Sequence, residues 1–456
     1  MTNKINRKVR SRTEHHFARK DFSDSMVTIA LFGMMAIYGP SFELGGQFRY
    51  IEVLLVAIFI LSINTVFRGI DNVTRLLIPL FLLTAISQII SDLYNNVPLG
   101  STIGRVGTFV LFVIVLVTVK RLANNDFGRM RWMLFGYALS WVFIYFVGTD
   151  AAPNYPDSPW RLGLGWAATM AVCLVITLQP RLNIVSGLLL LGMSLVHIIL
   201  GSRSIAIFAL FASVVTFWTI FSGADRPATL QWRKIATVSV VLIFGIFLGY
   251  QALLWATEKS LFPNDVQQRM QAQVSSPYGL AATSRPETAA ALKAIVKRPI
   301  IGFGSKAYDN EIWGYYIDVL NSNYLSYGNY AAIYKDSFYQ EWDAGLPSHS
   351  HLFGAWVDAG FLAIFSWLAV LALAFYTILS SINWRNTLTP LIIFIGSTTI
   401  WDVLFSPGPH RMDMAIRIMI LTYAVQLIRN QSGLPTASRP RRRKRARSYR
   451  MSLHGR

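Results

Sequence analysis

The sequence predicts an all-α polytopic membrane protein, and three observations support that class. Hydrophobic residues make up 53% of the 456 residues and charged residues only 14%, with a mean hydropathy of +0.42. Apolar runs long enough to cross about 30 Å of hydrocarbon as helices recur along the chain. Lys and Arg concentrate at its two ends. This composition is too apolar for several water-soluble domains.

About twelve membrane spans are expected, with nine of them between residues 25 and 256 and three between 350 and 429. The first run follows a polar segment and has no small-residue cleavage site, which indicates an uncleaved first helix. In chain order, the spans are predicted near residues 25–41, 50–67, 74–92, 102–119, 132–149, 161–179, 182–200, 204–222, 235–256, 350–379, 386–405 and 412–429.

The tails predict the orientation of the chain. Residues 1–20, within a polar tail of residues 1–24, carry seven Lys or Arg and one Glu, and residues 430–456 carry nine Lys or Arg and no acid. Positive segments flanking membrane helices stay on the cytoplasmic side and bind anionic lipids. Both termini are therefore expected in the cytoplasm, and the C-terminal tail is expected to be disordered. No nucleic-acid-binding pattern accompanies the charge, so no nucleic-acid partner is predicted.

One connection, residues 257–349, is too long to be a simple turn and falls on the outer face in this topology. Its aromatic residues are interspersed with Asp, Asn, Ser and Gly, as in EIWGYYIDVLNSNYLSYGNYAAIYKD. That composition predicts short helices that fold over the membrane surface and stack against sugar rings. An ordered but inert cap is the alternative.

Within this loop, Ser284 and Glu287 have the spacing of a capping box, with Pro286 in the first turn of a helix that Pro299 ends. Arg285 would then lie at a helix start, where its guanidinium and free backbone N–H groups can face a phosphate. Pairing of Arg285 with a loop carboxylate is the competing interpretation.

The tenth predicted span opens with two histidines, His349 and His351. At about 100° per residue, Gly360 falls on nearly the same helix face as His349, where it would let a neighbouring helix approach. His349 at the outer membrane edge is a candidate general base. His351 points about 200° away and is the weaker candidate. A simple lipid-headgroup contact is the alternative role for His349.

Three more arginines lie near the outer ends of predicted spans, namely Arg161, Arg203 and Arg411. An arginine in a hydrophobic span is costly unless it reaches the interface, so some of these serve as snorkelling anchors. Several guanidiniums and an imidazole at headgroup level suit a diphosphate-bearing lipid. The sequence has no DxD-like acidic cluster for Mg²⁺ and a single cysteine, Cys173, so we predict no metal site and no cofactor.

Three motifs together resemble the O-antigen ligase and O-antigen/exopolysaccharide polymerase superfamily of bacterial inner-membrane glycosyltransferases. They are Gly201-Ser202-Arg203-Ser204, Arg285 followed by the RPxxGxG pattern from Arg298 to Gly304, and His349-Ser350 separated by nine residues from Gly360. Each motif is short. Their order and their shared membrane face make the set specific.

The resemblance implies a GT-C-like helical fold in the bacterial inner membrane, with the large loop and the active face in the periplasm. It also implies metal-independent, inverting transfer of a glycan from undecaprenyl diphosphate to a glycan or a lipid A-core acceptor. Arg203 and Arg285 would bind the diphosphate and His349 would deprotonate the acceptor hydroxyl. Arg161, Arg298, Arg411 and His351 are further candidate substrate contacts, and polysaccharide export or chain-length proteins are candidate partners.

Two other classes of function remain open on the sequence. A transporter that flips a lipid-linked oligosaccharide also suits twelve spans, but its functional charges should lie near the membrane midplane. A non-catalytic scaffold of an export complex is the third possibility. Within the enzyme class, the phrase HSHLFGAWVDAG leans towards a polymerase over a ligase.

Overall fold

A computed structural model describes residues 25–38, 41–43, 47–147, 159–223, 227, 251, 254–255, 257–260, 264–305, 309–322, 346, 348–405 and 411–431. Over these residues the chain is almost entirely helical, which confirms the all-α class. One short antiparallel pair, β1 (Ser41–Glu43) with β2 (Gln47–Arg49), is the exception within those ranges. Most of the two predicted tails, most of the predicted ninth span and most of the aromatic segment after residue 322 lie outside the described residues.

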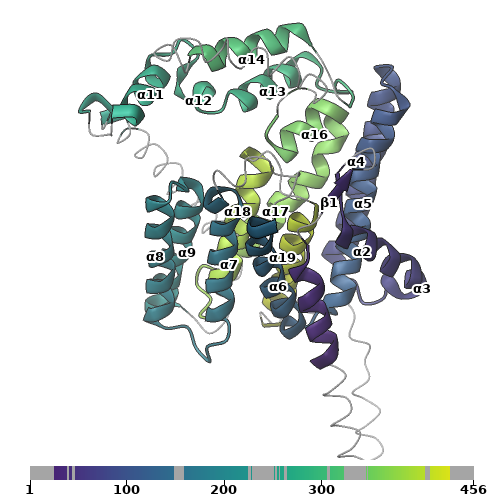
Figure 1. Cartoon of the computed structure of the whole chain (residues 1–456), viewed down its shortest axis with the longest axis vertical. Coiled ribbons are helices and arrows are strands. Elements are labelled where there is room, and N and C mark those ends of the chain that lie inside the picture. The colour runs from purple at the N-terminus through teal and green to yellow at the C-terminus, as the bar shows by residue number, and fades with distance from the viewer. Residues whose placement is uncertain are drawn as a thin grey trace, which may run out of the picture.

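The described helices form a bundle with a separate layer across one end, which we call the cap (Figure 1). The bundle begins with the helix Ser25–Ala36. It continues with α2 (Tyr50–Leu61), α3 (Ile63–Val66), α4 (Asn72–Tyr94), α5 (Leu99–Ala123), α6 (Phe127–Val147), the π-helical turn η1 (Trp160–Leu164), α7 (Gly165–Ile176), α8 (Ile184–Ile199), α9 (Arg203–Ser222), α17 (Ile364–Ser381), α18 (Thr389–Phe405) and α19 (Arg411–Gln431).

Four of the described helices are both long and apolar enough to cross a membrane. They are Asn72–Tyr94, Leu99–Ala123, Arg203–Phe221 and Phe361–Ser381. Five shorter apolar helices accompany them: Ser25–Ala36, Tyr50–Leu61, Gly165–Ile176, Ile184–Ile199 and Thr389–Phe405. These helices are consistent with a membrane protein, while the number twelve and the direction of insertion stay predictions.

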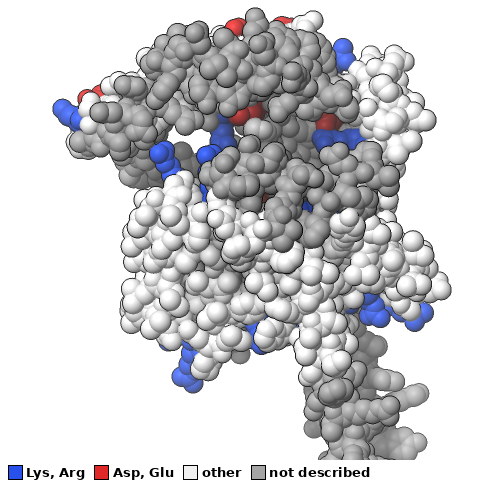
Figure 2. All heavy atoms as spheres, in the orientation of Figure 1, with Lys and Arg blue, Asp and Glu red and all other residues white. Residues whose placement is uncertain are grey.

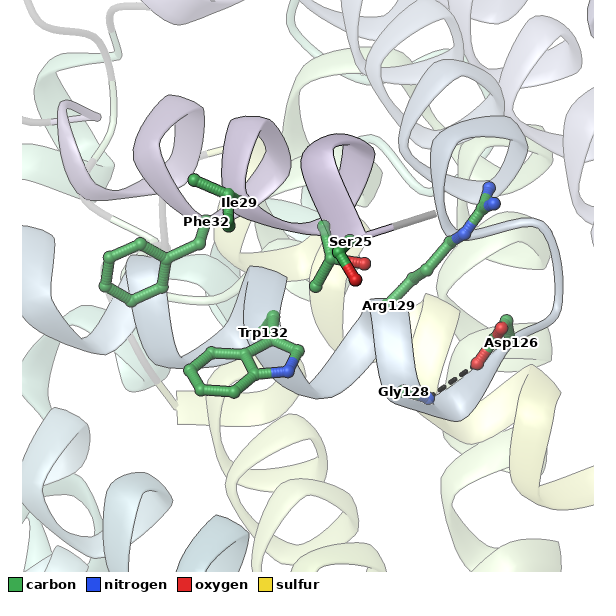
Figure 3. Close-up of a pocket in the computed structure, with 8 residues that line it drawn as sticks. Ser25, Ile29, Phe32, Asp126, Gly128, Arg129 and Trp132 are labelled. Carbon is green, nitrogen blue, oxygen red and sulfur yellow. Dashed lines mark hydrogen bonds between the residues drawn. The ribbon is translucent and has the colours of Figure 1, made fainter. Parts of the chain in front are cut away.

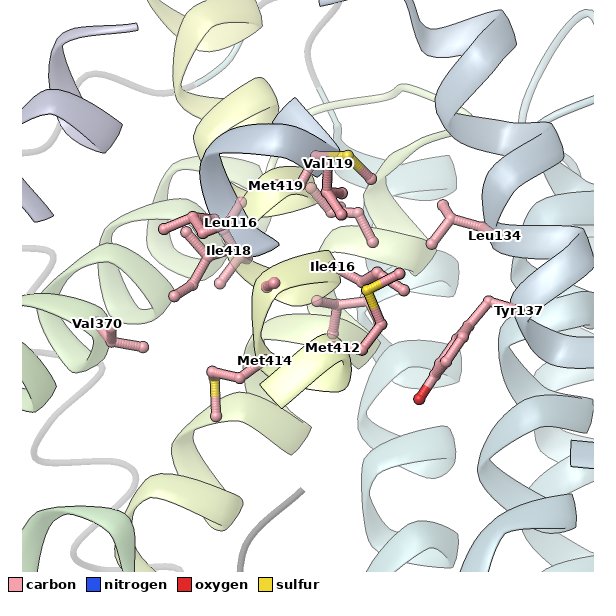
Figure 4. Close-up of a cluster of buried hydrophobic side chains, with 14 of the residues drawn as sticks. Leu116, Val119, Leu134, Tyr137, Val370, Met412, Met414, Ile416, Ile418 and Met419 are labelled. Atoms are coloured by element: carbon pink, nitrogen blue, oxygen red, sulfur yellow. The ribbon is translucent and has the colours of Figure 1, made fainter. Parts of the chain in front are cut away.

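Helix α19 fills the centre of the bundle (Figure 4). Its residues Met412, Met414, Ile416, Ile418 and Met419 are all 1% exposed or less. Successive positions are buried, so the helix has no free face, as expected for an element surrounded by others. The residues drawn around it come from α5, α6 and α17: Leu116, Val119, Leu134, Tyr137 and Val370.

The cap consists of α11 (Asn264–Ser275), α12 (Gly279–Ser284), α13 (Pro286–Lys297) and α14 (Asn310–Ser322). Its own hydrophobic core is separate from that of the bundle and reaches α16 (His351–Ala359) through Val357. The members of this core are Ala290, Ala291, Ala294, Ile295, Phe303, Ile312, Trp313, Tyr316, Leu346 and Val357. The described part of the long connection between residues 264 and 322 thus holds four short helices.

The tenth predicted span is not one helix, contrary to the expectation for residues 350–379. Helix α16 ends at Gly360, whose φ of +78° stops it, and a 3₁₀ turn, η3 (Phe361–Ala363), leads into α17. A positive φ is accessible to glycine because it has no Cβ. Gly360 therefore does not continue the face of His349, and the apolar pattern of residues 350–379 gave no sign of this break.

Gly360 lies instead against the RPxxGxG segment. A Cβ on Gly360 would come 2.1 Å from the carbonyl oxygen of Ile300, and a Cβ on Gly302 would come 2.7 Å from the backbone nitrogen of Gly360. Backbone N–H groups of Phe303 and Gly304 donate to the carbonyls of Val357 and Asp358 at 2.8 and 2.9 Å. The two glycine motifs thus join the cap to the bundle through direct backbone contact.

Polar side chains of α4 hold the same junction from the bundle side. Ser87 and Ser91 donate to the carbonyls of Ala359 and Asp358, each at 2.7 Å. The last carbonyls of a helix have no donor within that helix, and a buried carbonyl without a donor is unfavourable. These hydroxyls therefore donate hydrogen bonds to carbonyls at the end of α16. Asp92, near the C-terminal end of α4, accepts a hydrogen bond from the backbone N–H of Ser305 at 2.6 Å.

Two aspartates in the predicted tenth and eleventh spans pair with arginines. Asp358 pairs with Arg105 of α5, and Asp402 of α18 pairs with Arg417 of α19. Arg417 also lies over the Trp166 ring, with 5.1 Å from Cζ to the ring centroid. These charges stabilise contacts between helices.

Substitution of Gly360 by Ala should destabilise the protein by at least about 1–3 kcal/mol, because the new Cβ is strained at positive φ and collides with Ile300. The measurement is thermal unfolding of the detergent-solubilised protein. Gly107→Ala in α5 is the control, since a Cβ there meets no atom within 4 Å. Equal midpoints for the two variants would contradict the assigned junction.

Candidate functional site

Four charged side chains from three separate segments gather at the cap end of the bundle, and we call them the cap-end cluster. Arg161 comes from η1, Arg285 and Glu287 come from the start of α13, and His349 precedes α16. The helix ends hold them there: α13 begins at Pro286, and Ser350 caps α16 by accepting from Phe353 N–H at 3.0 Å. Three of the four were predicted from sequence, and Glu287 was predicted only as a capping residue.

The closest contact in the cluster joins His349 and Glu287. His349 Nδ1 lies 3.3 Å from Glu287 Oε1, and the two side chains are 45% and 17% exposed. The predicted capping box is wrong, because Arg285 and not Ser284 occupies the N-cap and Ser284 ends α12. The Glu287 carboxylate faces the imidazole of His349, whose side chain is partly exposed to solvent.

Burial alone would raise the pKa of Glu287. The hydrogen bond with His349 and the charges of His349 and Arg285 outweigh burial and hold the pKa below its ordinary value of 4.5. Glu287 is consequently a carboxylate over the physiological range of pH.

Arg285 is half-buried against α18. Its guanidinium lies over the Trp401 ring, 4.9 Å from Cζ to the centroid, and Nη1 donates to the carbonyl of Phe405 at 3.4 Å. Burial lowers the pKa of Arg285, Glu287 opposes this, and the nearby charge of Arg161 lowers the pKa further. Two guanidiniums that repel each other at the edge of a bundle form a site that an anion would stabilise.

Arg203 lies at the same end but outside the cluster. It is the first residue of α9 and is exposed. Phe208, further along α9, contacts the Trp401 ring with 5.8 Å between centroids, which places α9 beside the Arg285 site. Figure 2 shows Lys and Arg side chains along the hollow between cap and bundle. Within the described residues, Arg203 makes no ion pair.

The three other residues predicted to contact the substrate make contacts within the protein instead. Arg298 Nη1 donates to Asn95 at 2.5 Å, at the junction between cap and bundle. Arg411 forms a bidentate pair with the buried Glu52, at 2.9 and 2.8 Å. His351 stacks on Trp367 with 4.4 Å between ring centroids. Each makes a contact that holds helices together, and none joins the cap-end cluster.

Sequence reasoning missed two members of this environment. The sequence shows that Glu287 is an acid two residues after Arg285. Its capping-box spacing, however, favoured a hydrogen bond within its own helix over a contact with a distant residue. Trp401 carried no signal, since a tryptophan in an apolar span is indistinguishable from an interface anchor. Contacts between segments more than one hundred residues apart require the fold.

A hollow of about 450 Å³ lies between the helix Ser25–Ala36 and the start of α6 (Figure 3). Phe32 and Trp132 form its apolar wall, with 6.1 Å between ring centroids. Asp126 is engaged there in starting α6, because its Oδ1 accepts from Gly128 N–H at 2.7 Å. The full lining is Ser25, Thr28, Ile29, Phe32, Asp126, Gly128, Arg129 and Trp132. This hollow shares no residue with the cap-end cluster.

The cluster combines groups that can bind an anion with a group that can accept a proton. Arg161 and Arg285 supply positive charge, and His349 supplies an imidazole on the side open to solvent. Among the described residues, no three His, Cys, Asp or Glu side chains are placed to hold a metal ion. Comparison of the chain with protein-family models, curated proteins and solved structures gave no match.

The pH dependence of stability should reveal the Glu287 contact. Since the folded pKa lies below the unfolded value, ionised Glu287 stabilises the fold above about pH 4.5. This contribution is lost as the pH falls through the lowered folded pKa. The gap in unfolding midpoint between wild type and Glu287→Gln should therefore be present above about pH 4.5 and shrink as the pH falls below that value. A gap independent of pH would exclude the contact.

Proposed function

We propose that the protein is a membrane glycosyltransferase that transfers a glycan from undecaprenyl diphosphate to an acceptor hydroxyl at the cap end of the bundle. The observation that carries this proposal is the convergence of Arg161, Arg285 and His349 from three segments beside apolar helices. The sequence motifs that resemble the O-antigen ligase and polymerase superfamily contain two of these residues. A further motif residue, Arg203, lies at the same end of the bundle.

In the proposed reaction, the acceptor oxygen attacks the anomeric carbon while the bond from that carbon to the diphosphate oxygen breaks. The diphosphate departs with the electron pair, and the acceptor proton passes to His349. Arg161 and Arg285 stabilise the charge that develops on the leaving group, which lowers the barrier more than it strengthens ground-state binding. The displacement inverts the configuration at the anomeric carbon and needs no metal ion.

The position of the cluster suits a substrate that is part lipid and part glycan. The polyprenyl chain would remain beside the apolar helices, while its diphosphate reaches the arginines at the bundle end. The glycan and the acceptor would occupy the hollow below the cap. We assign this end to the periplasm and both termini to the cytoplasm of a bacterial inner membrane, on the basis of the basic tails. The resemblance to the superfamily also implies a GT-C-like fold.

Loss of either cluster arginine should slow transfer strongly. Arg161→Ala and Arg285→Ala should each reduce the rate by about 10²–10³-fold, as for a donor that stabilises a developing negative charge. The assay is transfer from a synthetic polyprenyl-diphosphate oligosaccharide by the purified protein. Arg181→Ala, an exposed arginine between α7 and α8, is the control and should retain the wild-type rate. Retained activity in both cluster variants would exclude the proposed diphosphate site.

His349→Ala should change the glycans that accumulate on the lipid carrier in the native bacterium, at equal protein level. Single repeat units on the carrier would identify a polymerase, and long chains left on the carrier would identify a ligase. The sequence favours the polymerase. An unchanged profile would overturn the role of His349 and favour a scaffold, while accumulation of donor on the cytoplasmic face would favour a transporter.

A further inference from the structure

We infer that Glu287 is a positioning residue that holds the His349 imidazole in the orientation needed for proton abstraction. The inference rests on the proposed function for its catalytic meaning, and on the structure for the contact itself. Glu287 does not touch the substrate in this arrangement. It acts through His349.

The first argument is the identity of the ring atom that faces Glu287. Oε1 lies 3.3 Å from Nδ1, so Nδ1 carries the hydrogen that the carboxylate accepts. In a neutral imidazole the other nitrogen then presents its lone pair. Nε2 is thereby left as the proton acceptor on a side chain that is 45% exposed.

The second argument is the backbone of His349. Its φ is +39°, a value that costs a residue with a Cβ about 1–3 kcal/mol and persists only where neighbouring contacts impose it. Ser350 supplies such contacts, since its Oγ accepts from Phe353 N–H and donates to the carbonyl of Val403 at 2.8 Å. Strain of this kind at a candidate base suggests that the side-chain position is maintained for function.

The third argument concerns charge. When the acceptor proton arrives, His349 becomes an imidazolium, and this new charge lies beside the Glu287 carboxylate. Glu287 is the carboxylate that contacts His349, and it also acts on Arg285. An ionised Glu287 therefore stabilises the protonated base in the transition state. Its burial, at 17% exposed, strengthens this interaction relative to a surface pair.

A purely local explanation is that Glu287 stabilises the first turn of α13 through the helix dipole. Glu311 provides a matched control, because it lies in the first turn of α14 and pairs with Lys293 and Lys297. Glu287→Gln and Glu311→Gln remove the same charge at equivalent helix positions. Only the first should affect His349.

The first test does not require transfer activity. The full-length protein in detergent is treated with diethyl pyrocarbonate at about pH 6, and modification of His349 is followed by mass spectrometry. The contact with Glu287 fixes which ring nitrogen is left open, so Glu287→Gln should change the modification rate by about 3- to 10-fold. Glu311→Gln should leave it unchanged. Equal rates in wild type and Glu287→Gln would overturn the inference, and Glu287→Ala serves the same test if the Gln variant does not fold.

The second test uses the transfer assay. Glu287→Gln should lower kcat by about 10²-fold or more, within the contribution expected of general-base catalysis, and leave KM for the donor unchanged. A rise in KM with unchanged kcat would place Glu287 in donor binding and overturn its positioning role. If wild type transfers no glycan, the proposed function fails, while the modification result still decides whether Glu287 controls His349.

Discussion

The close backbone contact between Gly302 and Gly360 is the constraint on which the arrangement of the cap depends. Any side chain at either position would force the two segments apart, because each Cβ would lie within 2.7 Å of backbone atoms. The contact fixes the end of α13 relative to the start of α17. Glu287 precedes Gly302 by 15 residues and His349 precedes Gly360 by 11, so the junction brings together the segments that carry them.

The junction is stable in an apolar setting because its backbone polar groups have partners. Ser87 and Ser91 of α4 serve the carbonyls at the end of α16, and Asp92 serves the backbone of Ser305. Buried groups of this kind are costly when unpaired, so the α4 side chains make a broken helix tolerable. Because the helix is broken at Gly360, α16 can pack against the cap. In a continuous span, α16 would follow the direction of α17 and His349 would lie in a different position.

The sequence predicted the helical class, the helices of the long connection and three members of the cap-end cluster. Hydropathy and helix-ending residues are local signals, which is why the helical class could be predicted from the sequence. The break at Gly360 was missed because glycine within an apolar run reads equally well as a packing position. Glu287 was assigned to its own helix because nothing local indicated the distant His349.

Helix α19 has a consequence for how the protein is made. Its buried side chains form the centre of a bundle whose walls come from α5, α6 and α17, all of which precede it in the chain. During synthesis, those walls leave the ribosome before the segment that fills the space between them. The nascent bundle must therefore keep an open interior, in contact with lipid or with the insertion machinery, until residues 411–431 arrive and complete it.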